Sequence, residues 1–207
     1  MLEKNLEKVP YGVARAPRES LLATHKVLRN TYALLSMTLL FSALMAGAAM
    51  AVNAAPLNPI LTLVAYLGLF FLTARLSDSA WGLAAVFALT GFMGWTLGPL
   101  LSLFMGAYAN GAQLAALAMG GTGAIFLGLS GYVLTTRKDF SFIGGFLAVG
   151  LLVAFLAVLA NLFFQVPTLA LTLSAVIVLL MSGFILYDTS RIIHGGETNY
   201  IMATVAL

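Results

Sequence analysis

The charged residues of this chain fall in a few clusters, and long uncharged runs separate them. The first cluster occupies residues 1–29. The later clusters are Arg75 with Asp78; Arg137, Lys138 and Asp139; and Asp188, Arg191 and Glu197. Because a transmembrane helix needs about 20 apolar residues to cross the hydrocarbon core, each uncharged run is long enough for two crossings and a turn. The pattern predicts three membrane hairpins.

Glycine and proline residues divide the uncharged runs into separate segments. They predict six spans at about 31–52, 58–74, 80–103, 112–135, 142–164 and 168–190. The fold class is therefore an all-α polytopic membrane bundle. A last apolar segment at 199–207 is too short to cross a bilayer. This segment either lies at the membrane interface or is the start of a seventh span in a longer chain, and we favour the second interpretation.

Composition and charge agree with this assignment. The chain is 61% hydrophobic and only 8% charged, whereas soluble domains carry roughly 25% charged residues. It has no cysteine, which excludes disulfides and thiolate metal sites. The net charge of +3 does not indicate a nucleic-acid partner, because most of the basic residues precede the first span, where they set orientation.

The positive-inside rule places the N-terminus and the charged loops in the cytoplasm. Residues 1–29 form a cytoplasmic polar tail, disordered to about residue 18, with a short interfacial helix near residues 21–28. Residues 30–207 form the transmembrane bundle. These boundaries predict a multi-pass membrane protein whose partners include the lipid bilayer.

Asp188 is the sharpest polar signal, because it follows an apolar run in the sixth predicted span. It is either an interfacial acid paired with Arg191 three residues on, or an ion or proton site facing the bundle interior. Arg75, at the end of the second span, is either its counter-charge on the ion pathway or a snorkelling topology anchor.

Other features favour structural roles. Gly94 and Gly98 form a G-x-x-x-G pattern, and Gly120, Ala124, Gly128 and Gly131 line one region of the fourth span. We interpret both sets as tight packing inside one bundle rather than a dimer face. The Gly128–Gly131 segment imitates the G-x-S-G of intramembrane serine proteases, but no histidine lies in a span to serve as its base.

Several motifs together resemble the transmembrane Bax inhibitor motif family. The segment Gly91–Leu100, the small-residue run Ala115–Phe126 and the stretch Ile185–Asp188 match its signatures. The segments Thr24–Thr31, Leu134–Asp139 and His194–Tyr200 are similar to its proteobacterial branch. The resemblance implies a seven-helix bundle around a central last helix. It also implies a pair of acids controlling a pH-sensitive calcium leak in some members. The first of these acids matches Asp188, which the resemblance thus makes a candidate calcium ligand.

Three functional hypotheses remain. The branch resemblance implies a non-enzymatic protein of the bacterial inner membrane that binds and restrains the membrane-anchored FtsH protease, acting with its membrane-associated regulators. The alternative is a calcium or proton leak that uses Asp188, with calcium as the transported ion and no bound cofactor. An intramembrane enzyme rests on Gly128–Gly131 alone. The oligomeric state is left open.

Overall fold

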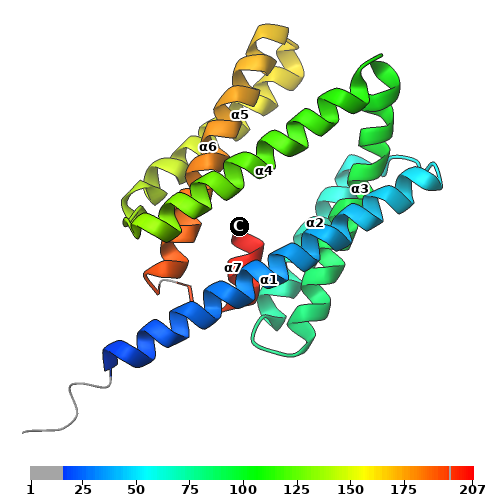
Figure 1. Cartoon of the computed structure of the whole chain (residues 1–207). Coiled ribbons are helices and arrows are strands. Elements are labelled where there is room, and N and C mark those ends of the chain that lie inside the picture. Colours follow the sequence, from blue (N-terminus) through cyan, green and yellow to red (C-terminus); the bar gives the residue numbers. More distant parts are fainter. Residues whose placement is uncertain (1–15, 196) are drawn as a thin grey trace, which may run out of the picture.

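The computed structural model describes residues 16–195 and 197–207, and the part it describes is helical throughout with no strand. Figure 1 shows the helices in chain order. The elements are α1 (Ala16–Ala51), α2 (Pro59–Leu76), α3 (Trp81–Ala107), α4 (Gly111–Thr136), the 3-10 turn η1 (Ser141–Ile143), α5 (Gly144–Phe164), α6 (Pro167–Ile193) and α7 (Tyr200–Ala206).

Six of these helices are long and apolar enough to cross a membrane. The candidate spans are Lys26–Ala51, Pro59–Leu76, Trp81–Ala107, Gly111–Thr136, Ser141–Phe164 and Pro167–Ile193. They agree with the six spans predicted from the sequence, and the all-α polytopic fold is confirmed. A seventh span stays an expectation, since α7 is a single short helix.

Local sequence signals place the helix ends. The Asn58 side chain accepts hydrogen bonds from Ile60 N at 2.9 Å and Leu61 N at 3.4 Å, which caps α2. Proline then occupies the first position of both α2 and α6, where its missing N–H costs nothing. At their other ends, α4 and α5 stop at Arg137 and Gln165, whose left-handed backbones turn the chain out of the helix.

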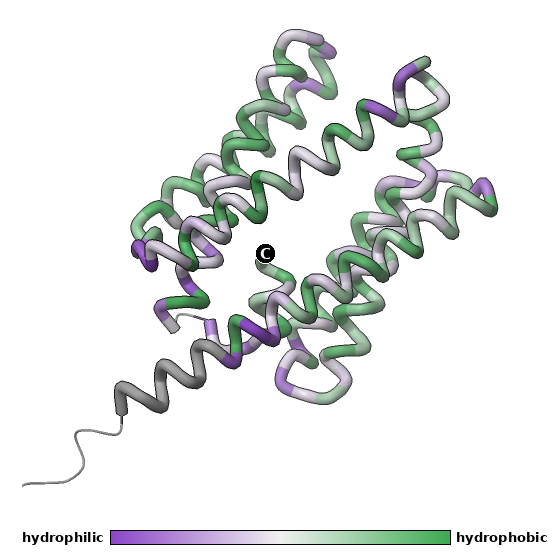
Figure 2. Tube along the Cα trace, viewed as in Figure 1, coloured by the Kyte–Doolittle hydropathy of each residue, from purple (hydrophilic) through white to green (hydrophobic). Residues whose placement is uncertain are grey.

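The helices form two groups. α1 and α2 pack on α3, while α4 and α5 pack on α6. Figure 1 shows α7 between these groups, with the C-terminal residue of the chain near the centre of the view. The groups meet where α6 contacts α1 and where α3 contacts α4. Figure 2 shows that the polar residues gather at the helix ends, as expected of a bundle surrounded by lipid.

The short helix α7 is held tightly against the first group. Ile201 is 1% exposed and packs with Leu34 of α1 and Val86 of α3. Thr204 Oγ1 donates to Thr31 O at 3.3 Å. One side of α7, with Ile201, Ala203 and Thr204, is therefore buried in the bundle. The helix takes a central position like the one that the family resemblance implies for the last helix.

The prediction that glycines allow tight packing is correct in the first helix group and wrong in the second. A Cβ at Gly94 would collide with Ser42 O, and one at Gly98 would lie 2.6 Å from Ala46 O. These glycines let the α1 and α3 backbones touch, so packing inside the bundle is correct for them. For α4 the same prediction is wrong. Nothing lies within 4 Å of a Cβ at Gly120, Gly128 or Gly131, because this side of α4 faces away from the other helices.

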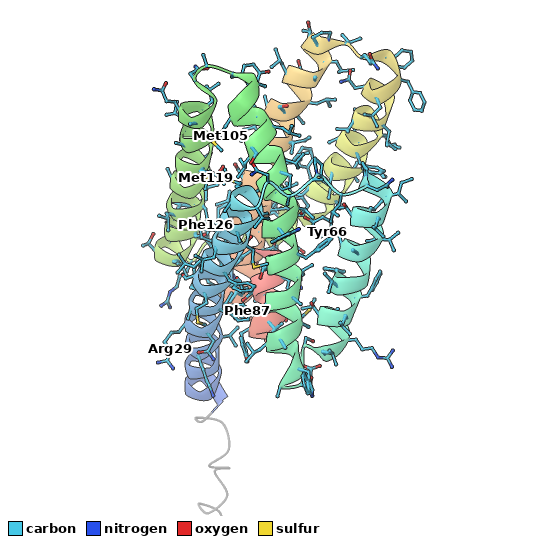
Figure 3. The ribbon with its side chains drawn as sticks, turned by 90° about the vertical axis from the view of Figure 1, so that its right-hand side faces the viewer. Arg29, Tyr66, Phe87, Met105, Met119 and Phe126 are labelled. Atoms are coloured by element: carbon cyan, nitrogen blue, oxygen red, sulfur yellow. The ribbon has the colours of Figure 1, made fainter. Side chains whose placement is uncertain are left out.

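Aromatic pairs join helices within and between the groups. Tyr66 of α2 lies edge-on to Phe92 of α3 at 5.2 Å, and its hydroxyl is 2.9 Å from Thr96 Oγ1. Tyr32 of α1 lies 6.2 Å from Phe126 of α4. Figure 3 shows the labelled rings of Tyr66 and Phe126 among the helices. The second pair connects the two groups directly.

The predicted tail falls partly outside the described residues. Residues 1–15 lie there, so the disorder predicted for them stays a prediction. For residues 16–18 the predicted disorder is wrong, because α1 begins at Ala16. The helix expected near residues 21–28 belongs to α1, which runs unbroken from Ala16 into the first span. This continuity has a simple cause, because residues 16–51 contain no proline after Pro17 and only one glycine. Its place at a membrane interface stays a prediction.

Candidate functional site

The charged residues with described side chains gather at one end of the bundle. This charged end is where the α1 span begins and where α2, α4 and α6 finish. It carries Lys26, Arg29, Arg75, Asp78, Arg137, Lys138, Asp139, Asp188, Arg191 and Glu197. The opposite end, made of residues 52–58, 108–110 and 165–166, has no charge. The asymmetry is the one the positive-inside rule describes.

Asp188 lies inside the charged end, not on its surface. It sits one and a half turns before the end of α6 and is only 8% exposed. In the described part of the chain, no hydrogen bond or ion pair reaches its carboxylate. Arg191 stands over the Tyr187 ring at 5.6 Å instead of pairing with the acid. The structure thus buries Asp188 and does not pair it with Arg191, and its role as an ion or proton site stays a prediction.

Arg75 is exposed in the last turn of α2. Helix α2 packs on α3, whereas α6 packs on α1, α4, α5 and α7. The structure thus does not bring Arg75 to Asp188. Its role as a counter-charge on an ion pathway stays a prediction, and its exposed position fits a snorkelling anchor.

Ser190 joins the α4–α5 loop to the end of α6. Its hydroxyl accepts a 2.9 Å hydrogen bond from Phe140 N and lies 3.4 Å from Lys138 O. His194 Nδ1 stands 2.9 Å from Ser190 O and 3.3 Å from Ser190 Oγ. Although it is fully buried, nothing in the sequence pattern distinguishes this serine from others in α6. Its partners Phe140 and Lys138 lie 50 and 52 positions away along the chain.

Asp139 completes this junction on the exposed side. Its carboxylate accepts a 2.8 Å hydrogen bond from Ser141 N, and Ser190 Oγ stands 3.4 Å away. Hydrogen bonds from the Ser141 side chain and backbone hold its pKa below the usual 3.8, with nearby His194 acting in the same direction and desolvation opposing them. Asp139 is therefore a carboxylate that anchors the loop.

Asn199 fixes the start of α7. Its side-chain oxygen accepts from Ile201 N at 2.9 Å and Met202 N at 3.3 Å, and its amide donates to Asp78 at 2.8 Å. Glu197 accepts a hydrogen bond from the backbone N of Asn199. An asparagine before an apolar run is a recognisable helix-start signal. Its bond to the α2–α3 loop could not be read from the sequence.

The structure does not bring together the serine and the histidine that an intramembrane protease would need. Ser130 lies inside α4 and is 2% exposed, so it does not have the accessible position of a nucleophile. His194, which contacts Ser190, is the only histidine with a described side chain. No group of three or more His, Cys, Asp or Glu side chains suited to a metal ion occurs among the described residues.

Comparison with known proteins decides the family. The model for the family described as inhibitor of apoptosis-promoting Bax1 matches residues 24–207. The chain belongs to this family. The Bax1 inhibitor family thus accounts for almost all of the bundle, including α7 and the charged end. The family resemblance drawn from the motifs is confirmed.

Several bacterial proteins are similar to this chain over most of its length. The chain is 52% identical over 190 residues to the modulator of FtsH protease YccA of Escherichia coli, covering 92% of this chain and 86% of that protein. It is 53% identical over 181 residues to an uncharacterized protein of Pseudomonas aeruginosa, covering 87% and 81%. An uncharacterized protein of Neisseria meningitidis is 34% identical over 191 residues, with coverage of 87% and 83%.

Proposed function

We propose that this protein binds and restrains an FtsH-type protease in the bacterial inner membrane, and so affects the turnover of other membrane proteins. The observation that carries the proposal is the 52% identity over 92% of the chain to a modulator of that protease. The name "inner membrane protein" of a second relative supports the location. We propose a regulatory role and no catalytic one.

The fold suggests how restraint would work. A membrane-anchored protease has to pull a segment of its substrate out of lipid before cleaving it, and each inserted helix is held there strongly. Here six apolar helices would have to be extracted. The polar residues before α1 are the segment that we propose the protease engages. A protein that is engaged easily but extracted slowly would occupy the protease and spare other substrates.

The proposal is tested by measuring substrate lifetimes in cells. Overproduction of the full chain should lengthen the half-life of a membrane-protein substrate of the protease, and an affinity-tagged chain should co-purify with the protease in mild detergent. An unrelated six-span protein produced at the same level is the control. If neither the lifetime nor the recovered protease differs from that control, the modulator role is wrong.

Deleting residues 2–15 distinguishes engagement of this segment by the protease from binding of the bundle to the protease. The deletion ends before α1 begins at Ala16, so the bundle should still insert. We expect the shortened chain to be degraded more slowly than the full chain. If the bundle itself binds the protease, overproduction of the shortened chain should still protect other substrates. Equal degradation rates for the two chains would rule out residues 2–15 as the engaged segment.

A calcium or proton leak is the second candidate, and the burial of Asp188 without a protein partner favours it. Charged groups inside membrane bundles commonly mark ion or proton paths. In liposomes containing the full chain, Asp188→Asn should abolish most of the pH dependence of calcium entry, with Asp78→Asn as the matched acid at the same end. An unchanged pH response in Asp188→Asn, or no flux at any pH, would contradict the leak.

A further inference from the structure

The loop between α4 and α5 carries two adjacent basic residues at the edge of the bundle. Arg137 and Lys138 follow Thr136, the last residue of the α4 span, and both side chains are exposed. Figure 1 shows this loop at the outer edge of the bundle, whereas α7 packs on α1, α3 and α6. The two cations therefore stand where the headgroups of the surrounding lipid meet the protein.

The Lys138 side chain is bent back toward the membrane. Its Nζ lies 5.8 Å from the centre of the Tyr132 ring, and Tyr132 precedes the last residue of the α4 span by one helical turn. At 1.5 Å per residue this span of 26 residues is about 39 Å long, so it exceeds the hydrocarbon core by about 4–5 Å at each end. Tyr132 then lies close to the boundary between hydrocarbon and headgroups. A lysine that only snorkels extends its ammonium into water, whereas Lys138 keeps it at the depth of the lipid phosphates.

Two aromatic rings lie beside this ammonium. Tyr132 is 41% exposed on α4, and the Phe140 ring lies 6.2 Å from it in a tilted arrangement. Tyrosine favours the membrane interface, because its ring enters apolar surroundings while its hydroxyl stays in polar ones. The loop cluster, defined as Tyr132, Arg137, Lys138 and Phe140, thus combines positive charge with an apolar surface. A phospholipid presents the complementary pair, which is a phosphate next to the first methylene groups of its chains.

Contacts with α6 hold the loop in place. Ser190 Oγ accepts a 2.9 Å hydrogen bond from Phe140 N and lies 3.4 Å from Lys138 O. Asp139, the acid next to Lys138, accepts from Ser141 N at 2.8 Å and lies 3.4 Å from Ser190 Oγ. Its carboxylate is therefore occupied by donors of the loop and of α6. A site that is already ordered loses little conformational entropy when a ligand binds.

We propose that the loop cluster binds the headgroup of an anionic phospholipid. Arg137 and Lys138 supply positive charge for one phosphodiester, and an arginine can bind two phosphate oxygens at once. Tyr132 and Phe140 contact the glycerol and the upper part of the chains. Basic residues at a membrane surface attract anionic lipids, whereas a zwitterionic lipid carries its own cation and is bound less well. The site goes beyond protease binding and does not depend on it.

Native mass spectrometry of the full chain in detergent measures the affinity for the first bound phosphatidylglycerol. Arg137→Gln with Lys138→Gln should weaken this affinity several-fold. Glutamine adopts the same left-handed backbone at Gln165, so this double variant should keep the turn after α4. The matched control is Lys26→Gln with Arg29→Gln, which removes the same charge from exposed positions at the same end. The control should bind the lipid like the wild type.

Equal weakening in both double variants would show only a general attraction of anionic lipid to the charged end, and would overturn the site. An unchanged affinity in Arg137→Gln with Lys138→Gln would overturn it as well. Inorganic phosphate at millimolar concentration should leave the bound lipid in place, because the chains contribute to binding. Displacement of the lipid by inorganic phosphate would instead show a site for the free anion and contradict the proposal.

Quenching by brominated lipid locates the site in a bilayer. Trp81→Phe and Trp95→Phe remove the two tryptophans of the chain, and Tyr132→Trp places a single reporter that keeps the cation–π contact with Lys138. In phosphatidylcholine nanodiscs, brominated phosphatidylglycerol should quench this reporter at a several-fold lower mole fraction than brominated phosphatidylcholine. Adding Arg137→Gln with Lys138→Gln should abolish the difference. Equal quenching by the two lipids in the reporter chain would show that the loop cluster does not select anionic lipid.

Discussion

The side-chain amide of Asn199 donates a 2.8 Å hydrogen bond to the Asp78 carboxylate, although the two residues are 121 positions apart in the chain. The same asparagine caps α7 through its oxygen. One side chain therefore starts the last helix and fastens it to the α2–α3 loop. The position of α7 between the two helix groups depends on this contact together with the packing of Ile201.

A double-mutant cycle should detect the bond between Asn199 and Asp78. Because the bond is exposed, we expect Asp78→Ala to lower the free energy of unfolding by about 0.5 kcal/mol. Asn199→Ser keeps a capping oxygen but is too short to reach Asp78, and should cost a similar amount. Asn199→Ala should cost about 1 kcal/mol more because the cap is also lost. Additive effects of Asp78→Ala and Asn199→Ser would show that the contact contributes nothing.

The α1–α3 interface should be sensitive to added volume at Gly94. A Cβ there collides with Ser42 O, so Gly94→Leu should lower the free energy of unfolding by at least 1–3 kcal/mol, roughly the cost of overpacking. Gly128→Leu is the matched control, because nothing lies within 4 Å of its Cβ. The control should be neutral or gain about 1 kcal/mol from helix propensity. Thermal unfolding in detergent measures the stability of both variants. Equal melting temperatures for Gly94→Leu and Gly128→Leu would contradict the close approach of α1 and α3.

Asp139 should titrate below the usual aspartate range. Hydrogen bonds from Ser141 favour the charged form in the folded protein, so the carboxylate stabilises the fold above pH 3.8, and this contribution is lost as the pH falls through the lowered folded pKa. Ser141→Ala should move the pKa of Asp139 up toward 3.8, while Ser182→Ala at a distant helical site should not. Carbon NMR of the labelled carboxyl, assigned with Asp139→Asn, measures the shift. A pKa of Asp139 that stays the same in Ser141→Ala would contradict the assignment.

Single cysteines can establish the orientation in the membrane, since the chain has none of its own. We expect cysteines at Ala55, Ala109 and Val166 to react with an impermeant thiol reagent added from outside intact cells. A cysteine at Ser79 should react only after the membrane is opened. Asn53 and Gln165 are avoided because their positive backbone φ would be strained by cysteine. Labelling of the cysteine at position 79 from outside, with protection of the other three, would show that the opposite orientation is correct.

The sequence by itself determined the membrane class and the six spans. Apolar runs of span length leave few alternatives in a bilayer, since unpaired backbone groups there are too costly for any structure but a helix or a closed barrel. The positions of the charged residues in the sequence also predicted correctly that they lie at one end of the bundle. Local chemistry marked some helix ends, such as the Asn58 cap and the prolines that open α2 and α6.

Only the tertiary structure decided which faces of the helices meet. Two glycine patterns look alike in the sequence, yet a Cβ at Gly94 or Gly98 would collide with α1, while one at Gly128 or Gly131 would meet nothing within 4 Å. Lipid and protein are equally apolar, so hydrophobicity does not distinguish a packed face from an exposed one. The partners of Ser190 in the α4–α5 loop and of Asn199 in the α2–α3 loop likewise lie far away in the chain. A helical pattern fixes each helix separately, and the contacts between helices are set only when the whole bundle assembles.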